Sequence, residues 1–75
     1  MGTISGSVYT WGGDPVTGAA VTSTIGGAAL TVGGNFVMVN PAGVCNVAVN
    51  GVTKRWNVTV NAGQNTNVGT MQIFA

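Results

Sequence analysis

Turn-forming residues recur along this chain at intervals too short for helices. Glycine accounts for 13 of the 75 residues, and the segments between glycines are rich in Val, Thr and Asn rather than in Leu, Glu, Lys or Gln. Within these segments apolar and polar residues alternate, which is the period of a strand with one buried face. The spacing therefore predicts an all-β fold without helices.

Seven short strands are predicted. The turn at Asp14-Pro15 ends the first, because proline fixes its own φ and holds the preceding residue extended. Strands of this length and spacing are typical of a small antiparallel β-sandwich with Greek-key connections, here one domain over residues 1–75. The odd spacing of Val68 and Met71 predicts a β-bulge at Gly69, which would turn both residues, and Ile73, toward the core. The predicted strands span residues 4–9, 19–25, 28–32, 36–39, 44–50, 52–61 and 66–74.

The alternation also predicts which side chains are buried. Trp56 is expected in the core, so Trp56→Ala should cost about 3–5 kcal/mol. Cys45 shares a face with two core valines and is the only cysteine, so we expect a buried, reduced thiol. The predicted core is Ile4, Val8, Val21, Leu30, Phe36, Val47, Val49, Trp56, Val58 and Ile73.

Charged residues are scarce. The chain has two basic residues, Lys54 and Arg55, one carboxylate side chain, Asp14, and no histidine. Neighbouring strand residues face opposite ways, so the two cations do not form a basic patch, and we expect no binding to nucleic acid or to membranes. Paired carboxylates, a Ser-His-Asp triad and a histidine metal site cannot be assembled. We therefore expect no enzyme, no cofactor and no metal.

Several large apolar side chains do not fit the predicted core. Tyr9 and Trp11 lie on the face opposite Ile4 and Val8, Val37 and Val39 alternate with Phe36 and Met38, and Phe74 is out of step with Ile73. Exposed apolar patches tend to mark interfaces. A local mini-core over a loop and a platform for stacking carbohydrate are the alternatives. The candidate interface residues are Tyr9, Trp11, Val37, Val39 and Phe74.

A set of motifs spread over nearly the whole chain resembles the carboxypeptidase regulatory-like domain. The resemblance implies a seven-stranded transthyretin-like (prealbumin-like, Ig-like) sandwich. It also implies a non-catalytic module of secreted or surface proteins, or an accessory part of a larger assembly. The motifs are Ile4-x-Gly6-x-Val8, Pro15-Val16-x-Gly18-Ala19-x-Val21, Gly34-Asn35-Phe36, Pro41-Ala42-Gly43, Val47-x-Val49 and Val58-x-Val60-x-x-Gly63-x-x-Thr66-x-Val68.

Two functions stay open. The first is a structural subunit that builds or decorates a multi-copy assembly, for which we expect a bacteriophage virion, since the chain begins at Met1 without a leader and avoids charge. The second is a secreted or cell-surface binding module, or a filament or adhesin subunit. A small scaffold without disulfides commonly gains stability by association. We therefore expect contacts with copies of itself or with a larger assembly, through β-edge addition and the candidate interface residues.

Overall fold

The computed structural model describes residues 1–74, which form seven strands and no helix. Each observed strand lies within two residues of its predicted bounds, so the predicted all-β class and strand count are confirmed. Glycines at positive φ, such as Gly34 and Gly51, lie in the turns that separate the strands. The strands are β1 (Gly2–Thr10), β2 (Ala20–Ser23), β3 (Ala28–Leu30), β4 (Asn35–Asn40), β5 (Gly43–Val49), β6 (Val52–Val60) and β7 (Asn65–Ile73).

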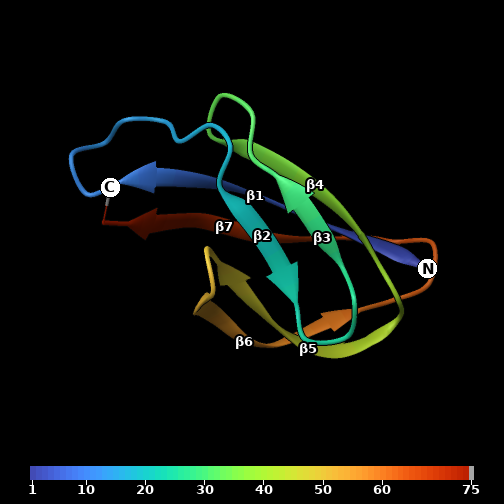
Figure 1. Ribbon diagram of the computed structural model, residues 1–75. Coiled ribbons are helices and arrows are strands. Elements are labelled where there is room, and N and C mark those ends of the chain that lie inside the picture. The colour runs from blue at the N-terminus through green and yellow to red at the C-terminus, as the bar shows by residue number, and fades with distance from the viewer. Residues whose placement is uncertain (75) are drawn as a thin grey trace.

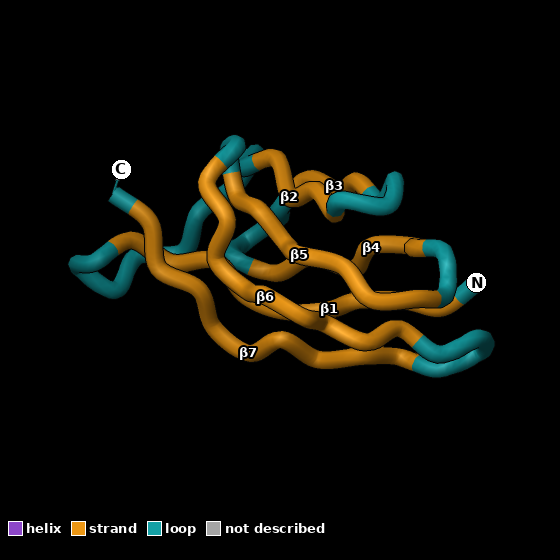
Figure 2. Tube along the Cα trace, turned by 90° about the horizontal axis from the view of Figure 1, so that it is seen from below, coloured by secondary structure: helices purple, strands orange, loops and turns teal. Residues whose placement is uncertain are grey.

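The strands form two sheets that pack face to face as a sandwich (Figures 1 and 2). Sheet A has the order β4-β1-β7, and sheet B has the order β3-β2-β5-β6. The chain crosses between the sheets at the β3–β4, β4–β5 and β6–β7 connections and again after β1. Each sheet consequently has an inner face that is buried and an outer face that is exposed.

One strand pair departs from the predicted antiparallel arrangement. β1 and β7 are parallel neighbours, with a register that runs from Thr3↔Asn65 to Thr10↔Ile73. After β6 the chain turns from sheet B into sheet A. There β7 runs beside β1 in the same direction. Alternation of apolar and polar residues is the same in parallel and antiparallel strands, so the sequence held no sign of this direction.

The core lies between the inner faces of the two sheets. Eight of the ten predicted core residues are confirmed as buried, and Cys45, predicted separately, is buried with them. Met38, Val60 and Met71 add further fully buried side chains from β4, β6 and β7. The buried apolar residues are Ile4, Val8, Ala19, Val21, Phe36, Met38, Cys45, Val47, Val49, Val58, Val60, Met71 and Ile73.

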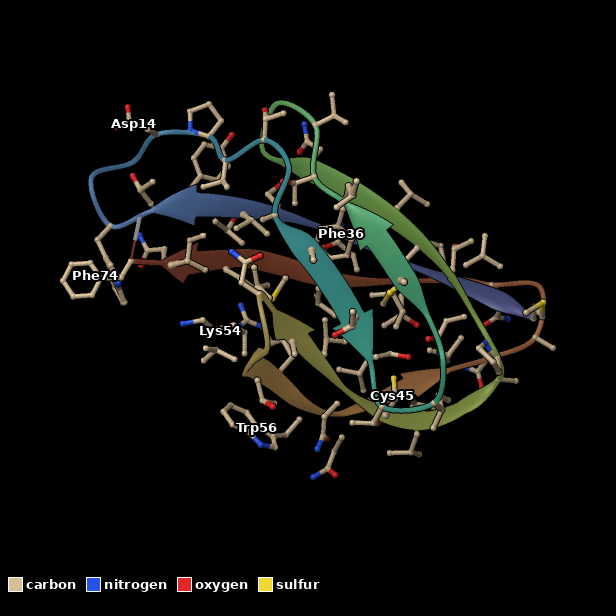
Figure 3. All side chains as sticks on the ribbon, viewed as in Figure 1. Asp14, Phe36, Cys45, Lys54, Trp56 and Phe74 are labelled. Carbon is tan, nitrogen blue, oxygen red and sulfur yellow. The ribbon has the colours of Figure 1, made fainter. Side chains whose placement is uncertain are left out.

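The prediction that Trp56 is a core residue is wrong. Its side chain is 65% exposed and projects away from sheet B (Figure 3). From the pair Cys45↔Val58 to the pair Val47↔Arg55 the register advances two residues on β5 but three on β6. This bulge, where Asn57 adopts a φ of 52°, reverses which residues face inward. Arg55 therefore points toward the interior side, and Trp56 points to solvent.

The prediction that Leu30 is buried is also wrong, because its side chain is 64% exposed. β3 is three residues long, and Ala29 is the residue paired with the buried Val21. Leu30 pairs with the exposed Ala20 and so lies on the outer face of sheet B. A strand this short gives one inward position, and the smaller residue occupies it.

The predicted β7 bulge at Gly69 is confirmed. Between Ser5↔Asn67 and Ser7↔Thr70 the register advances two residues on β1 and three on β7, and Gly69 has a φ of 74°. The extra residue turns Met71 and Ile73 into the core, and Val68 packs against it. Gly69 therefore sets the register of the whole C-terminal half of β7.

A buried polar residue ties the two sheets together. Asn40, at the end of β4, is fully buried. Its Nδ2 donates to the carbonyl of Pro41 at 2.8 Å and lies 3.9 Å from the Cys45 Sγ, and its Oδ1 accepts a hydrogen bond from the Ser23 hydroxyl. An added Cβ at Gly27 would collide with the Asn40 amide. A polar side chain in this position is satisfied on both its donor and its acceptor side.

The burial of Cys45 leads to a direct test. We expect the native thiol to react slowly with a maleimide or disulfide reagent, because its residue is only 3% exposed and the thiolate has no path to solvent. Labelling followed by mass spectrometry, native and in denaturant, measures the difference. The matched control is Val44→Cys, since Val44 is an exposed neighbour and its introduced thiol should react at once. Equally fast native labelling of Cys45 would contradict the buried position.

Candidate functional site

The few ionisable side chains of the described residues lie apart from one another. Within residues 1–74 no three His, Cys, Asp or Glu side chains come together in a way that could hold a metal ion. Asp14 lies in the exposed loop after β1, whereas Lys54 lies on β6 (Figure 3). Arg55 follows Lys54 on the same strand. The candidate site is therefore a surface, and its properties follow from the outer faces of the two sheets.

On the outer face of sheet A, β4 carries two exposed apolar side chains. Val37 and Val39 are 67% and 59% exposed, because they alternate with the buried Phe36 and Met38. Val37 lies beside Ser5, and Val39 lies beside Thr3. Each valine on β4 is therefore bordered by a polar residue of β1.

The opposite end of sheet A holds the aromatic candidates. β1 and β7 are last paired at Thr10↔Ile73, so Trp11 and Phe74 leave the sheet from neighbouring strands. Both are exposed, Phe74 by 95%, and Figure 3 shows the Phe74 ring projecting beyond the end of the sheet. Two exposed aromatic residues therefore lie at this end of sheet A.

Tyr9 differs from its two aromatic neighbours because it is half-buried. It bridges to Pro15 of the loop that follows β1. A Cβ on Gly34 would lie 2.9 Å from the Pro15 Cβ and 3.4 Å from the Tyr9 ring. Tyr9, Pro15 and Gly34 thus pack closely, which favours a local mini-core for this residue.

Sheet A therefore does not bring the five candidate residues into one patch. Val37 and Val39 lie at one end, next to Ser5 and Thr3, and Trp11 and Phe74 lie at the other. Along β1, the distance from Thr3 to Tyr9 is about 20 Å at the usual rise of a strand. The five residues share one sheet but form two separate apolar areas.

A hollow of about 440 Å³ lies next to the β4 area, and Phe36 and Val37 line part of it. Hydroxyl and amide side chains of β1, β4 and β7 line it, and Ser7 donates to the Asn35 Oδ1 at 2.9 Å. Gly6 and Gly69, at the β7 bulge, also line it. The polar lining residues are Ser5, Ser7, Asn35, Asn67 and Thr70.

The outer face of sheet B exposes further apolar side chains that the sequence analysis missed. Trp56, Leu30 and Val44 project from β6, β3 and β5. Between them lie small residues, because Thr22 of β2 pairs with both Ala28 and Ala48. The positive φ of Asn57 is the feature that exposes Trp56, and asparagine is one of the few non-glycine residues that adopt it readily. Asn57 next to Trp56 is compatible with such a bulge, but an asparagine in a strand does not by itself predict one.

One side of the sandwich is closed by Arg55. Its Nε donates to the carbonyl of Val68 at 3.0 Å and its Nη2 to the carbonyl of Thr70 at 2.8 Å. Nη1 donates to the carbonyl of Lys54 at 2.9 Å. The guanidinium therefore joins the edge of β6 in sheet B to the edge of β7 in sheet A, where no backbone ladder connects them.

Among residues 1–74 no helix has the length and apolar character needed to cross a membrane. Comparison of the chain with protein-family models, with curated proteins and with solved structures finds no match, so its relation to the carboxypeptidase regulatory-like domain stays a prediction.

Proposed function

We propose that this protein is a non-catalytic structural subunit that packs in many copies within or upon a larger assembly, and we expect that assembly to be a bacteriophage virion. The observation behind the proposal is the exposure of large apolar side chains on both outer faces of the sandwich. A closed dimer needs one self-complementary patch, whereas a larger assembly needs at least two contact surfaces. Apolar area on two opposite faces of the sandwich therefore supports a larger assembly.

The charge distribution supports the same proposal. The chain has three charged side chains, and none of them lies on sheet A or on β2, β3 or β5. Two copies can therefore approach through sheet A, or through the β3-β2-β5 part of sheet B, without burying an unpaired charge, which is the costly event in forming an interface. The polar surface consists instead of Thr, Asn and Ser, which can form hydrogen bonds with a neighbour.

We infer further that the fold is the transthyretin-like, Greek-key form of the β-sandwich. Its support is the strand order β4-β1-β7 opposite β3-β2-β5-β6, in which the first strand is central in its sheet and the last is its parallel neighbour. The motifs that resemble the carboxypeptidase regulatory-like domain lie on these strands and their turns. This assignment concerns architecture and adds no activity.

A binding module of the secreted or cell-surface type is the second candidate, favoured by the hollow on sheet A and its polar lining residues. Its lining of uncharged hydroxyl and amide groups matches the hydrogen-bonding needs of a neutral polyol or saccharide. Chemical-shift titration of the protein with neutral oligosaccharides tests it. Shifts confined to Ser5, Ser7, Asn35, Asn67 and Thr70 are the expected result for this candidate.

The structural role is tested by mass in solution. We expect sedimentation velocity over a concentration series to show species heavier than the 7.4 kDa chain. Trp11→Ser and Trp56→Ser, one beside each sheet, should each reduce this association, and the double variant should reduce it further. These side chains are exposed, so each change should alter the free energy of unfolding by no more than about 0.5 kcal/mol.

The matched control is Val32→Ser, because Val32 is exposed in the β3–β4 turn and belongs to neither outer face. It should associate like the parent protein. A parent protein that stays monomeric at all concentrations, and binds no larger particle, contradicts the structural role and leaves the binding module.

A further inference from the structure

The four edge strands of the sandwich are protected to different degrees. β3 offers only three residues. β6 and β7 contain bulges, and Arg55 and a hydrogen bond from the Thr66 hydroxyl to the Thr59 carbonyl join them. Bulges, short length and side-chain covers are the usual means by which proteins prevent edge pairing.

β4 is the edge without a bulge, a charge or a side-chain cover along Val37–Val39, although β3 lies near it and Val32 pairs with Asn35 at its start. Its pairing with β1 runs through six consecutive residue pairs without a register shift. No charged residue and no proline lie within Asn35–Asn40. An edge that is straight, uncharged and flanked by exposed valines is a template for pairing with another strand.

The direction of the backbone groups on β4 follows from its ladder. The Gly34 carbonyl accepts a hydrogen bond from the Val8 amide, whereas Asn35 exchanges both of its backbone hydrogen bonds with Val32 on the other side. Backbone groups alternate in an antiparallel strand. The N–H and C=O of Val37 and Val39 therefore point away from β1, toward the free edge.

These groups have no partner within the described chain. No backbone bond outside the strand ladders and no side-chain bond of residues 1–74 involves the N–H or C=O of Val37 or Val39. Both side chains are largely exposed, so nothing covers this edge on the outer side. The edge presents two donors and two acceptors in strand spacing.

We propose that β4 pairs antiparallel with β4 of a second copy, around a two-fold axis at Met38. This inference rests on the proposed structural role and names one of its contacts. In this register Val37 of one copy faces Val39 of the other, and each pair exchanges both backbone hydrogen bonds. Sheet A then continues into a six-stranded sheet across two copies, twice the three strands of one copy.

The ends of β4 and its side chains favour this register. The next hydrogen-bonding pair outward along β4 would place Asn35 opposite Pro41, which has no N–H to donate. Asn35 is in addition already hydrogen-bonded to Val32. Pairing is therefore confined to the two valines. Their side chains meet on the outer face, where valine pairs across strands are favourable, and no charge opposes the contact because β4 and its neighbour β1 carry none.

Amide hydrogen exchange measured by NMR tests this contact at single residues. We expect the amides of Val37 and Val39 to exchange rapidly in dilute protein and about tenfold or more slowly in concentrated protein. The Phe36 and Met38 amides already point to β1 and serve as an internal reference. Sedimentation velocity on the same samples reports the mass independently.

Two variants complete the experiment. Val37→Lys places two like charges near the two-fold axis and should abolish the concentration-dependent protection of Val39. Val44→Lys is the matched control, because Val44 is similarly exposed on sheet B and the protection should persist. If mass rises while the Val37 and Val39 amides keep one exchange rate, the β4 contact is overturned and the structural role stands. If mass never rises, the β4 contact is overturned, and the structural role is overturned with it if the protein also binds no larger particle.

Discussion

Replacement of Ile4 by alanine is expected to leave the protein close to unfolding at 25 °C. Ile4 lies in the central strand of sheet A and is fully buried. Loss of a buried isoleucine to alanine costs about 2–5 kcal/mol, from lost burial and the cavity that remains. A domain of this length has about 4–11 kcal/mol of stability in total. Urea denaturation followed by tryptophan fluorescence gives the change in the free energy of unfolding.

Trp56→Ala is the informative control, since it removes a larger side chain from an exposed position. It should change the free energy of unfolding by about 0.5 kcal/mol or less, in place of the 3–5 kcal/mol that its predicted burial implied. The midpoint of the Trp56→Ala variant should therefore lie far above that of Ile4→Ala. The reverse order would mean that the inward and outward faces of β1 and β6 are assigned wrongly.

Replacement of Arg55 by methionine is expected to destabilise the protein by about 2–3 kcal/mol, because hydrogen bonds from charged groups contribute about that much. Methionine keeps an apolar stem of similar length but cannot donate to the Val68 and Thr70 carbonyls that Arg55 contacts. The two sheets would lose their side-chain link at the β6–β7 side. Denaturant titration measures the loss.

Lys54→Met is the matched control, because it also removes one positive charge from β6. Lys54 makes none of the side-chain hydrogen bonds between β6 and β7, so its replacement should have little effect. Arg55→Lys should recover only part of the stability, since one ammonium cannot copy the planar fork of donors. Equal destabilisation by Arg55→Met and Lys54→Met would attribute the effect to net charge and exclude the link.

The strands of this protein could be predicted because glycine-rich turns and alternating residues are local features. All seven appear where expected, and the bulge at Gly69 was visible from the odd spacing of Val68 and Met71. The bulge in β6 was not, because Arg55 to Val60 alternates cleanly in sequence. The β6 bulge depends on Asn57 adopting a positive φ. That backbone conformation is determined by the contacts of the folded chain.

The candidate surface could be predicted only in part for the same reason. Val37 and Val39 were found because β4 alternates without interruption, Trp11 because it shares the face opposite Ile4 and Val8, and Phe74 because it is out of step with Ile73. Their grouping into one patch was not predictable, since it depends on which strands are neighbours. The role of Arg55 was also hidden, because carbonyl acceptors on β7 leave no mark in the sequence.

The parallel pairing of β1 with β7 has a consequence for how the chain reaches its native state. Thr10 and Ile73 are neighbours in space but 63 positions apart, so a ribosome adding ~5–20 residues per second makes the second about 3–13 seconds after the first. During that interval the central strand of sheet A has one side unpaired. Contacts so distant in sequence also slow the search for the native topology. A nascent chain of this kind is exposed to wrong pairings until its last strand arrives.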